Sequence, residues 1–379
     1  MQIDPVVLTQ ELIRCPSVTP EEGGAIVLLE TLLGQFGFRC TRISRGGVEN
    51  LYARWGDGTP VFAFAGHTDV VPTGDEAAWT HQPFSGNIED AVLWGRGAVD
   101  MKSGVAAFVA AAAELVTATP PEGSISLLIT GDEEGPATDG TVAILDWMRE
   151  QGETADFCLV GEPTSQVRVG DNIKIGRRGS MTGTLTVRGQ QGHTAYPERA
   201  VNPLPVLASA SARLSDLPID MGSTHFQAST LALSSIDTGN PASNVIPSEG
   251  RAVFNVRFND LQTSDSIKVW AEQIVANALE GTGCTADVDW SVSGESFLTE
   301  PGPLVDIPVD AITDRQLERP ALTTGGGTSD ARFIKDLCPV MELGLVGDTM
   351  HQTDERVPVE DIRLLSDIYG DILRRFFGV

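Results

Sequence analysis

Apolar, strand-like segments of this chain repeatedly end at a glycine-rich break that is followed by an imidazole or carboxylate side chain. The clearest case is residues 61–74, VFAFAGHTDVVPTG, where an apolar run long enough for a buried strand breaks at Gly66. The side chains that follow such breaks are His67, Asp100, Glu133, Glu134 and Glu162. Open α/β sheets place their chemistry at the carboxyl ends of parallel strands. The repeated pattern therefore predicts one such sheet with these side chains at one edge.

A distant histidine fits the same pattern, because His351 follows the apolar run 340–346 and the turn Gly347-Asp348. Imidazoles combined with several carboxylates make a nitrogen and oxygen ligand set suited to zinc or a similar divalent ion. The set is larger than one tetrahedral ion needs. With one bridging carboxylate it suits two ions roughly 3.5–4 Å apart, so we expect a dinuclear metal centre.

Two pairs of nearby residues give finer expectations. Glu133 and Glu134 point apart on an extended chain, so one can bind metal while the other acts as general base. His67 and Asp69 point the same way on an extended chain. Asp69 is therefore placed to accept the ring N–H that a metal leaves free, which would fix the orientation of the imidazole.

Each candidate also has a simpler interpretation. Asp100 could cap a helix, Glu162 could be a solvated turn residue, and His351 could be a surface histidine. Short motifs match by chance often enough that no single one decides the question. Their joint occurrence at matching positions after strand-like segments favours the metal site.

Length and charge limit the class of protein. A chain of 379 residues is long for one compact core, so two domains are expected. The 41% apolar content is that of a globular protein. The formal net charge of -26 disfavours nucleic acid as a partner, because binding it requires basic surfaces.

No segment of the sequence indicates export or membrane insertion. Residues 1–5 lack the basic and apolar regions of a signal peptide, and the longest apolar stretch, residues 104–116, is too short to cross a bilayer. The five cysteines are scattered and form no CxxC pair, which suits a reducing compartment. We therefore expect a cytoplasmic protein with no membrane partner.

The order of the expected elements divides the chain into two domains. Strands and helices alternate up to residue 178, which indicates a mainly parallel sheet covered by helices. From residue 179 the order is strand, helix, strand, strand, helix, strand, which is the split βαβ plan. We expect an α/β catalytic domain with a mixed, mainly parallel sheet at 1–178 and 294–379, and an inserted α+β domain at 179–293. The expected strands are 39–44, 50–55, 62–65, 124–130, 156–160, 180–188, 230–236, 249–258, 285–292 and 340–346, and the expected helices are 4–13, 21–36, 141–150, 201–214 and 265–279.

Several motifs resemble those of the co-catalytic zinc aminoacylase and carboxypeptidase family. They are GHTDVVPTG (66–74), WGRGAVDMKSG (94–104), GDEEG (131–135) and GEPT (161–164). Further stretches resemble a member that hydrolyses the amide of an N-succinylated diamino acid, among them GQQGHTAYPERAVNP (189–203), TGGGTSDARF (324–333) and TMHQTDERV (349–357). The resemblance covers nearly the whole chain. It implies a zinc-binding α/β domain with an inserted lid through which two chains form a homodimer.

The resemblance also implies roles for individual residues. His67 and Glu162 would hold one Zn²⁺, Glu134 and His351 a second, and Asp100 would bridge the two ions, which Co²⁺ can replace. Glu133 would be the base, Asp69 would orient His67, and His193 would reach the other subunit's site and stabilise an oxyanion. The positions that match contacts to substrate carboxylates are Arg177, Ser180, Tyr196, Asn244, Arg257 and Thr328.

The implied activity is metal-dependent hydrolysis of an acylated amino acid. Two alternatives stay open: the same chemistry on acetylornithine or another N-acyl amino acid, and a zinc-binding relative without turnover. The intact Glu133 and Asp69 argue against the second alternative. Gly347 and Gln352 stand where some family members carry Asn and Lys, so the resemblance does not carry a substrate contact from that loop over to this chain.

Overall fold

The computed structural model describes residues 2–379 and divides into two compact units. Unit 1 comprises the chain through Ile175 together with Thr299–Thr323 and Ser329–Val379. Unit 2 comprises Gly176–Leu298 and Thr324–Thr328. Met1, the first residue of the expected domain 1–178, lies outside the described range.

Unit 1 is built on an eight-stranded sheet. Its strands, in spatial order, are β1 (Arg39–Arg45), β2 (Val48–Trp55), β6 (Ser124–Thr130), β3 (Val61–His67), β7 (Phe157–Val160), β18 (Val340–Glu342), β8 (Asn172–Lys174) and β17 (Ala321–Thr323). The four central strands β6, β3, β7 and β18 run parallel, whereas β1 and β2 pair antiparallel at one edge. The predicted mixed, mainly parallel sheet is therefore confirmed.

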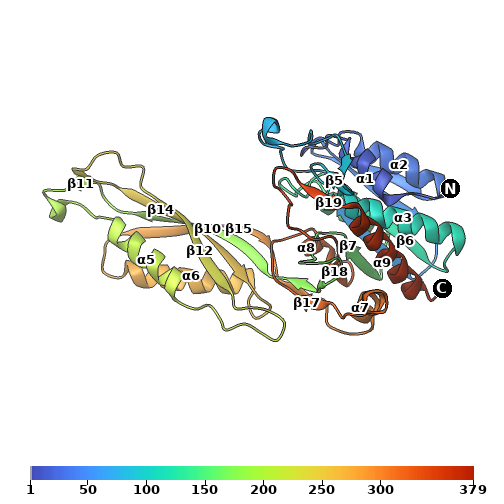
Figure 1. Ribbon diagram of the computed structural model, residues 1–379. Helices are drawn as coiled ribbons and strands as arrows, with labels where there is room; N and C mark the ends of the chain where they lie inside the picture. Colours follow the sequence, from blue (N-terminus) through green and yellow to red (C-terminus); the bar gives the residue numbers. More distant parts are fainter. Residues whose placement is uncertain (1) are drawn as a thin grey trace. The chain divides into compact units, whose positions relative to one another are not determined.

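Helices cover this sheet. They are α1 (Pro5–Ile13), α2 (Ala25–Gln35), α3 (Lys102–Ala118), α4 (Thr141–Gln151), α7 (Pro303–Gln316), α8 (Ala331–Ile334) and α9 (Val359–Phe377). The alanine-rich α3 packs against α1, α9 and β3, and it lies side by side with α9 in Figure 1. All seven residues of β3 are buried. This burial explains why the strand is mainly apolar, because a strand at the centre of such a sheet is covered on both faces.

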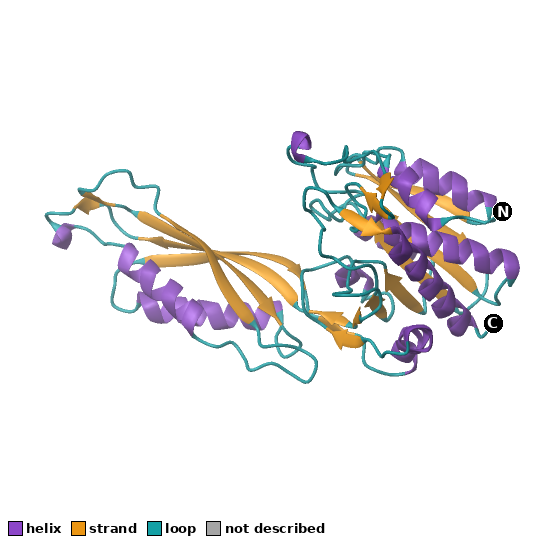
Figure 2. Cartoon of the chain, viewed as in Figure 1, coloured by secondary structure: helices purple, strands orange, loops and turns teal. Residues whose placement is uncertain are grey.

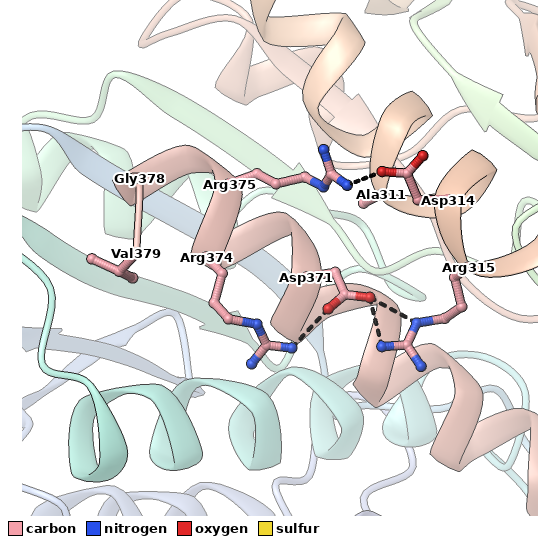
Figure 3. Close-up of a pocket in the computed structure, with 8 residues that line it drawn as sticks. All are labelled: Ala311, Asp314, Arg315, Asp371, Arg374, Arg375, Gly378 and Val379. Atoms are coloured by element: carbon pink, nitrogen blue, oxygen red, sulfur yellow. Dashed lines mark hydrogen bonds and ion pairs between the residues drawn. The ribbon is translucent and has the colours of Figure 1, made fainter.

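The surface between α7 and α9 carries a network of ion pairs. Asp371 contacts Arg315 at 2.6 Å and Arg374 at 2.7 Å, and Arg375 pairs with Asp314 (Figure 3). These side chains are partly exposed, and ion pairs near the surface stabilise a fold by about 0–1 kcal/mol each. The apolar face of α9, which includes Leu365, supplies the larger part of its packing energy.

A small antiparallel sheet in unit 1 was not predicted. It pairs β4 (Asn87–Glu89), β5 (Val92–Trp94) and β19 (Arg356–Pro358). The pairing places Trp94 opposite Arg356. It therefore sets the segment that precedes Asp100 beside the loop that follows His351.

Unit 2 contains an antiparallel sheet with the spatial order β12 (Thr230–Asp237), β14 (Glu249–Phe258), β10 (Gly179–Arg188) and β15 (Thr285–Gly294). Helices α5 (Leu204–Asp216) and α6 (Ser264–Leu279) lie along one side of it (Figure 2). Phe254, Leu207 and Ile267 belong to the core between the helices and the sheet. Four short strands complete the unit, namely β9 (Gly176–Arg177), β11 (Gly192–His193), β13 (Val245–Ile246) and β16 (Phe297–Leu298). The element order β10, α5, β12, β14, α6, β15 is the predicted split βαβ plan.

Two element boundaries differ from the sequence predictions by four residues. Helix α2 begins at Ala25 and not at residue 21, because Gly23 and Gly24 adopt positive φ angles of 57° and 97°. Strand β18 ends at Glu342 and not at residue 346, so the loop that leads to His351 is longer than expected. Among residues 2–379, none of the helices combines the length and apolarity needed to cross a lipid bilayer.

Candidate metal centre

The carboxyl ends of the four central parallel strands carry most of the predicted ligands. His67 is the last residue of β3, Glu133 and Glu134 follow β6, Glu162 follows β7, and His351 lies in the loop after β18. Because these strands are neighbours in the sheet, residues up to 284 positions apart in sequence are brought to one edge.

Asp100 reaches the same place by a different route. We expected it after a strand of the main sheet, but the preceding strand, β5, belongs to the separate three-stranded sheet. Asp100 stands just before α3 and does not cap it, because Met101 occupies the N-cap position and makes no side-chain cap bond. The helix-cap interpretation of Asp100 is therefore wrong.

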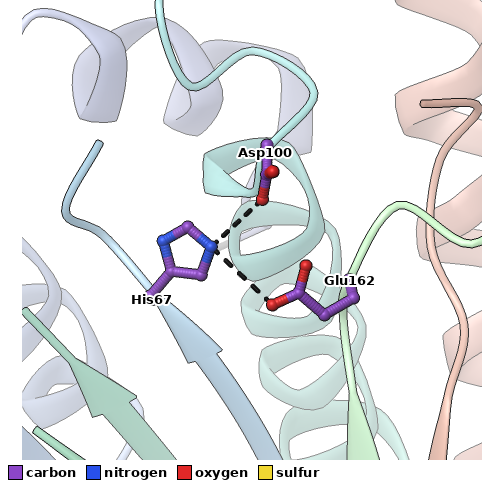
Figure 4. A group of neighbouring side chains, drawn as sticks. All are labelled: His67, Asp100 and Glu162. Atoms are coloured by element: carbon purple, nitrogen blue, oxygen red, sulfur yellow. Dashed lines mark hydrogen bonds and ion pairs between the residues drawn. The ribbon is translucent and has the colours of Figure 1, made fainter. Parts of the chain in front are cut away.

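The two oxygens of Asp100 face two different histidines. Oδ1 lies 3.1 Å from Nε2 of His67, and Oδ2 lies 3.2 Å from Nε2 of His351. Glu162 Oε1 lies 3.8 Å from Nε2 of His67 (Figure 4), and Glu134 Oε1 lies 2.7 Å from Nε2 of His351. One carboxylate is thus shared by two sets of three side chains.

Each set has the composition of a metal site. His67, Asp100 and Glu162 offer ligand atoms that all lie within 4.8 Å of one another, and so do Asp100, Glu134 and His351. Both sets consist of nitrogen and oxygen donors, which suit zinc and other divalent ions. These residues can hold metal ions. Glu162 is only 8% exposed, so its interpretation as a solvated turn residue is wrong.

Asp69 contacts the site differently from the sequence prediction. The Nδ1 atom of His67 lies 2.9 Å from the main-chain carbonyl oxygen of Asp69, whereas the Asp69 carboxylate is 3.7 Å away. That buried carboxylate accepts hydrogen bonds from Thr19 Oγ1 at 2.7 Å and from the main-chain N–H groups of Glu133 and Glu134 at 3.2 and 3.0 Å. Asp69 therefore orients His67 through its main chain and fixes the Glu133-Glu134 segment through its side chain.

Glu133 and Glu134 do not point to opposite sides. Both offer an oxygen within 4.8 Å of His67, because residues 131–135 form a turn and not an extended strand. Burial raises the pKa of Glu133 to about 8, partly offset by the charge of His67. A carboxylate with a pKa near neutrality is suited to general base catalysis.

The charges at the site are strongly coupled. Burial alone would raise the pKa of Asp100, but hydrogen bonds from His351 and His67 lower it below its ordinary value. The hydrogen bonds with Asp100 and Glu134 raise the pKa of His351 to about 10. Burial raises the pKa of Glu162, and the negative charges of Asp100 and Glu133 add to the effect. Crowded carboxylates of this kind are what a divalent cation neutralises.

Sequence reasoning missed three buried charged residues next to this centre. Glu355 accepts a hydrogen bond from the main-chain N–H of Asp100 at 3.1 Å, and Arg96 pairs with Glu355 at 2.8 Å. Asp330 accepts from Thr141 Oγ1 at 2.7 Å, and burial raises its pKa to about 6. Arg96 stands inside the motif WGRGAVDMKSG, but nothing in the sequence pairs it with Glu355.

The predicted substrate contacts all lie in unit 2. One group surrounds the start of β10, where Ser180 stands opposite Arg257 on β14. Arg177 donates from Nη1 to the Gly327 carbonyl at 2.8 Å, next to Thr328. Unit 2 thus contains Arg177, Ser180, Arg257 and Thr328.

A second group lies around β11 and β13. His193 stands opposite Val245, the neighbour of Asn244, and its ring lies 5.9 Å from that of Tyr196. Nδ1 of His193 accepts the main-chain N–H of Ala195 at 3.0 Å. In the neutral imidazole the proton therefore sits on Nε2.

Comparison with known proteins places the chain in a family. The model of peptidase family M20/M25/M40 matches residues 63–375. A Cereibacter sphaeroides protein named succinyl-diaminopimelate desuccinylase is 57% identical over 380 residues, with 100% of both chains covered. The motif-based resemblance to this family is confirmed.

Solved structures share the fold. Aminopeptidase PepT of Bacillus cereus has a TM-score of 0.80 at 21% identity, with 97% of each chain covered. The YXEP protein of Bacillus subtilis, described as a dinuclear metal binding peptidase, has a TM-score of 0.76 at 15% identity, with 99% of this chain and 98% of that chain covered. Sequence and fold together lead to one conclusion: the chain belongs to peptidase family M20/M25/M40.

Proposed function

We propose that this enzyme hydrolyses N-succinyl-LL-2,6-diaminopimelate to succinate and LL-2,6-diaminopimelate, a step of lysine biosynthesis by the diaminopimelate route. The observation that carries the proposal is the 57% identity, over the full length of both chains, to a protein named succinyl-diaminopimelate desuccinylase. The shared carboxylate of Asp100 between two histidines supports an active centre of the same kind.

Two divalent ions are proposed to bind there, Zn²⁺ by preference, with Co²⁺ as a substitute. His67 and Glu162 would hold one, Glu134 and His351 the other, and Asp100 both, in agreement with the two sets of ligand atoms. Ions bound in this way polarise the amide carbonyl and increase the acidity of water.

The protein's own residues would move the proton. Glu133 takes a proton from the attacking water as the new C–O bond forms at the amide carbon. It then gives that proton to the leaving nitrogen as the C–N bond breaks. Its pKa of about 8 leaves it able to accept and release a proton near neutral pH.

Arginines are needed to bind the substrate, because the chain's net charge of -26 repels an anion. Arg177 and Arg257 are the candidates for the succinyl carboxylate, since a guanidinium can pair with a carboxylate through two hydrogen bonds. Ser180 and Thr328 would add hydroxyl donors beside them.

The active enzyme is proposed to be a homodimer formed through unit 2. In strand β10 the stretch from Ser180 to Arg188 spans roughly 27 Å at about 3.4 Å per residue, and His193 lies beyond its far end. One small substrate cannot contact both ends within one chain. We therefore assign His193 of the partner subunit, with Asn244 and Tyr196, to the completed site.

The tautomer of His193 supports this role. Because its Nδ1 accepts the N–H of Ala195, Nε2 carries the proton and can donate to a developing oxyanion.

The compartment proposed for the enzyme is the cytoplasm, which agrees with five cysteines that are all free thiols.

A side-by-side assay tests the substrate. Purified enzyme loaded with Zn²⁺ is given succinyl-diaminopimelate and acetylornithine under identical conditions. We expect a kcat/KM at least a hundredfold higher for the succinylated substrate. Preference for acetylornithine would reassign the enzyme to that deacylation, and a protein that binds zinc without turnover on either would contradict the proposal.

A further inference from the structure

The buried pair of Arg96 and Glu355 has no assigned role, and we propose that it positions Asp100 and His351 relative to each other and thereby sets the metal affinity of the centre. The inference rests on the proposed metal centre. Neither residue supplies a ligand atom to the three groups found among residues 2–379. Both are positioning residues that act through the main chain.

Glu355 is surrounded by N–H donors from the segment that carries Asp100. Its Oε2 accepts from Arg96 Nη1 at 2.8 Å and from the Gly97 N–H at 3.0 Å. Its Oε1 accepts from the N–H groups of Val99 at 2.8 Å and Asp100 at 3.1 Å. The side chain is fully buried, so these bonds replace water and fix the main chain up to the shared carboxylate.

Arg96 also contacts the main chain of the loop that contains His351 and of the segment that follows His67. Nη1 also donates to the Gln352 carbonyl at 3.2 Å, and Nη2 lies 3.5 Å from the His351 carbonyl. Nη2 also donates to the main-chain carbonyl of Pro72 at 3.3 Å, in the segment that follows His67. One guanidinium thus joins the main chain on both sides of the centre.

The loop around His351 needs such support. His351 has a φ angle of 61°, a left-handed conformation that residues other than glycine adopt only when their surroundings impose it. The loop is closed by reciprocal hydrogen bonds between Thr349 and Arg356, at 3.0 and 3.1 Å. Arg96 holds the middle of this loop through its hydrogen bond to the Gln352 carbonyl.

The geometry leaves no equivalent substitute for either residue. Glu355→Gln would turn an NH₂ group toward two N–H donors, because each carboxylate oxygen already accepts two bonds. Arg96→Lys would keep the charge but lose the planar fork that reaches Glu355, Gln352 and Pro72 together. A buried ion pair is weak evidence for stability by itself. The arrangement around the ligands is therefore the more specific consequence of this pair.

The test compares Glu355→Gln and Arg96→Lys with the wild type. Glu153→Gln is the matched control, because Glu153 pairs with Arg54 at 2.5 Å and accepts from Tyr52 at 2.9 Å without approaching the ligands through either bond. Three quantities are measured: Co²⁺ and Zn²⁺ affinity by chelator competition, the visible absorption spectrum of the Co²⁺ form, and the melting temperature without metal.

We expect both variants of the pair to bind metal 10- to 100-fold more weakly, the range found for residues that orient ligands, with an altered Co²⁺ spectrum. The control should change only the melting temperature. A folded Glu355→Gln or Arg96→Lys protein with wild-type affinity and spectrum would overturn the inference. If Glu355→Gln does not fold, Arg96→Lys decides by the same criteria. A wild-type protein that binds no metal would instead contradict the proposed function.

Discussion

The carboxylate of Asp69 accepts the main-chain N–H of Glu134 at 3.0 Å, and this bond ties the β3 end of the site to the β6 end. The neighbouring bond to the Glu133 N–H, at 3.2 Å, holds the proposed base in the same way. Asp69 therefore contributes to the geometry of the Glu133-Glu134 turn as well as to that of His67.

Replacing Asp69 by Asn should lower kcat at least a hundredfold with little change in KM. The amide group of Asn would meet an N–H donor of the turn, which displaces Glu133 from the position where it accepts a proton. Steady-state kinetics at saturating zinc provide the measurement. Thr19→Val removes the hydroxyl that contacts this carboxylate and the Val70 carbonyl but leaves both N–H bonds of the turn in place, so it should have a smaller effect. Wild-type kcat in Asp69→Asn would refute the positioning role.

Glu133→Gln should strongly reduce turnover but leave metal binding intact. The amide keeps the shape of the side chain and cannot accept the proton, so kcat should fall by about 10²–10⁴-fold. Metal content by elemental analysis should stay that of the wild type. Activity within tenfold of the wild type would show that another group is the base.

Gly97→Ala should destabilise the segment that carries Asp100. Gly97 has a φ of 82°, and an added Cβ would lie 2.8 Å from a Val70 methyl carbon. We expect a loss of about 1–3 kcal/mol in the free energy of unfolding, measured with urea on metal-free protein. Gly47 has a φ of 90° with open space around it, so Gly47→Ala isolates the backbone cost. Equal losses in the two variants would contradict the steric account.

The buried amine of Lys102 should make the free energy of unfolding depend on pH. Its Nζ donates to the carbonyls of Leu12 and Cys15, and burial lowers its pKa from 10.5 to about 8. Between these values the unfolded chain binds the extra proton, so this group makes the free energy of unfolding rise as pH rises from about 8 to 10.5. Urea denaturation of metal-free protein over that range should show the slope, and Lys102→Met should lack it. The same slope in both proteins would rule out Lys102 as its source.

The sequence predicted the strand ends better than the path of the chain between them. Strands β3, β6 and β7 are fully buried and mainly apolar, so their ends and the adjacent ligands could be located from apolar runs and glycine alone. Asp100 was assigned to the wrong sheet, because the short strand β5 has the same local appearance as a strand of the main sheet.

Contacts that depend on main-chain geometry could not be predicted. The turn at Glu133-Glu134 brings both carboxylates to one side, against the alternation expected of an extended chain. Glu355 lies 255 residues from Asp100, and its four N–H donors become neighbours only after the sheets have formed. Charge and residue type alone do not reveal such a partner.

In the proposed metal centre, Asp100 stands between two metal ions. Crystals grown with Zn²⁺ and measured at the zinc absorption edge test it directly. We expect two anomalous peaks roughly 3.5–4 Å apart, one beside His67 and Glu162 and the other beside Glu134 and His351, with Asp100 between them. A single peak at saturating zinc, or peaks away from Asp100, would contradict it.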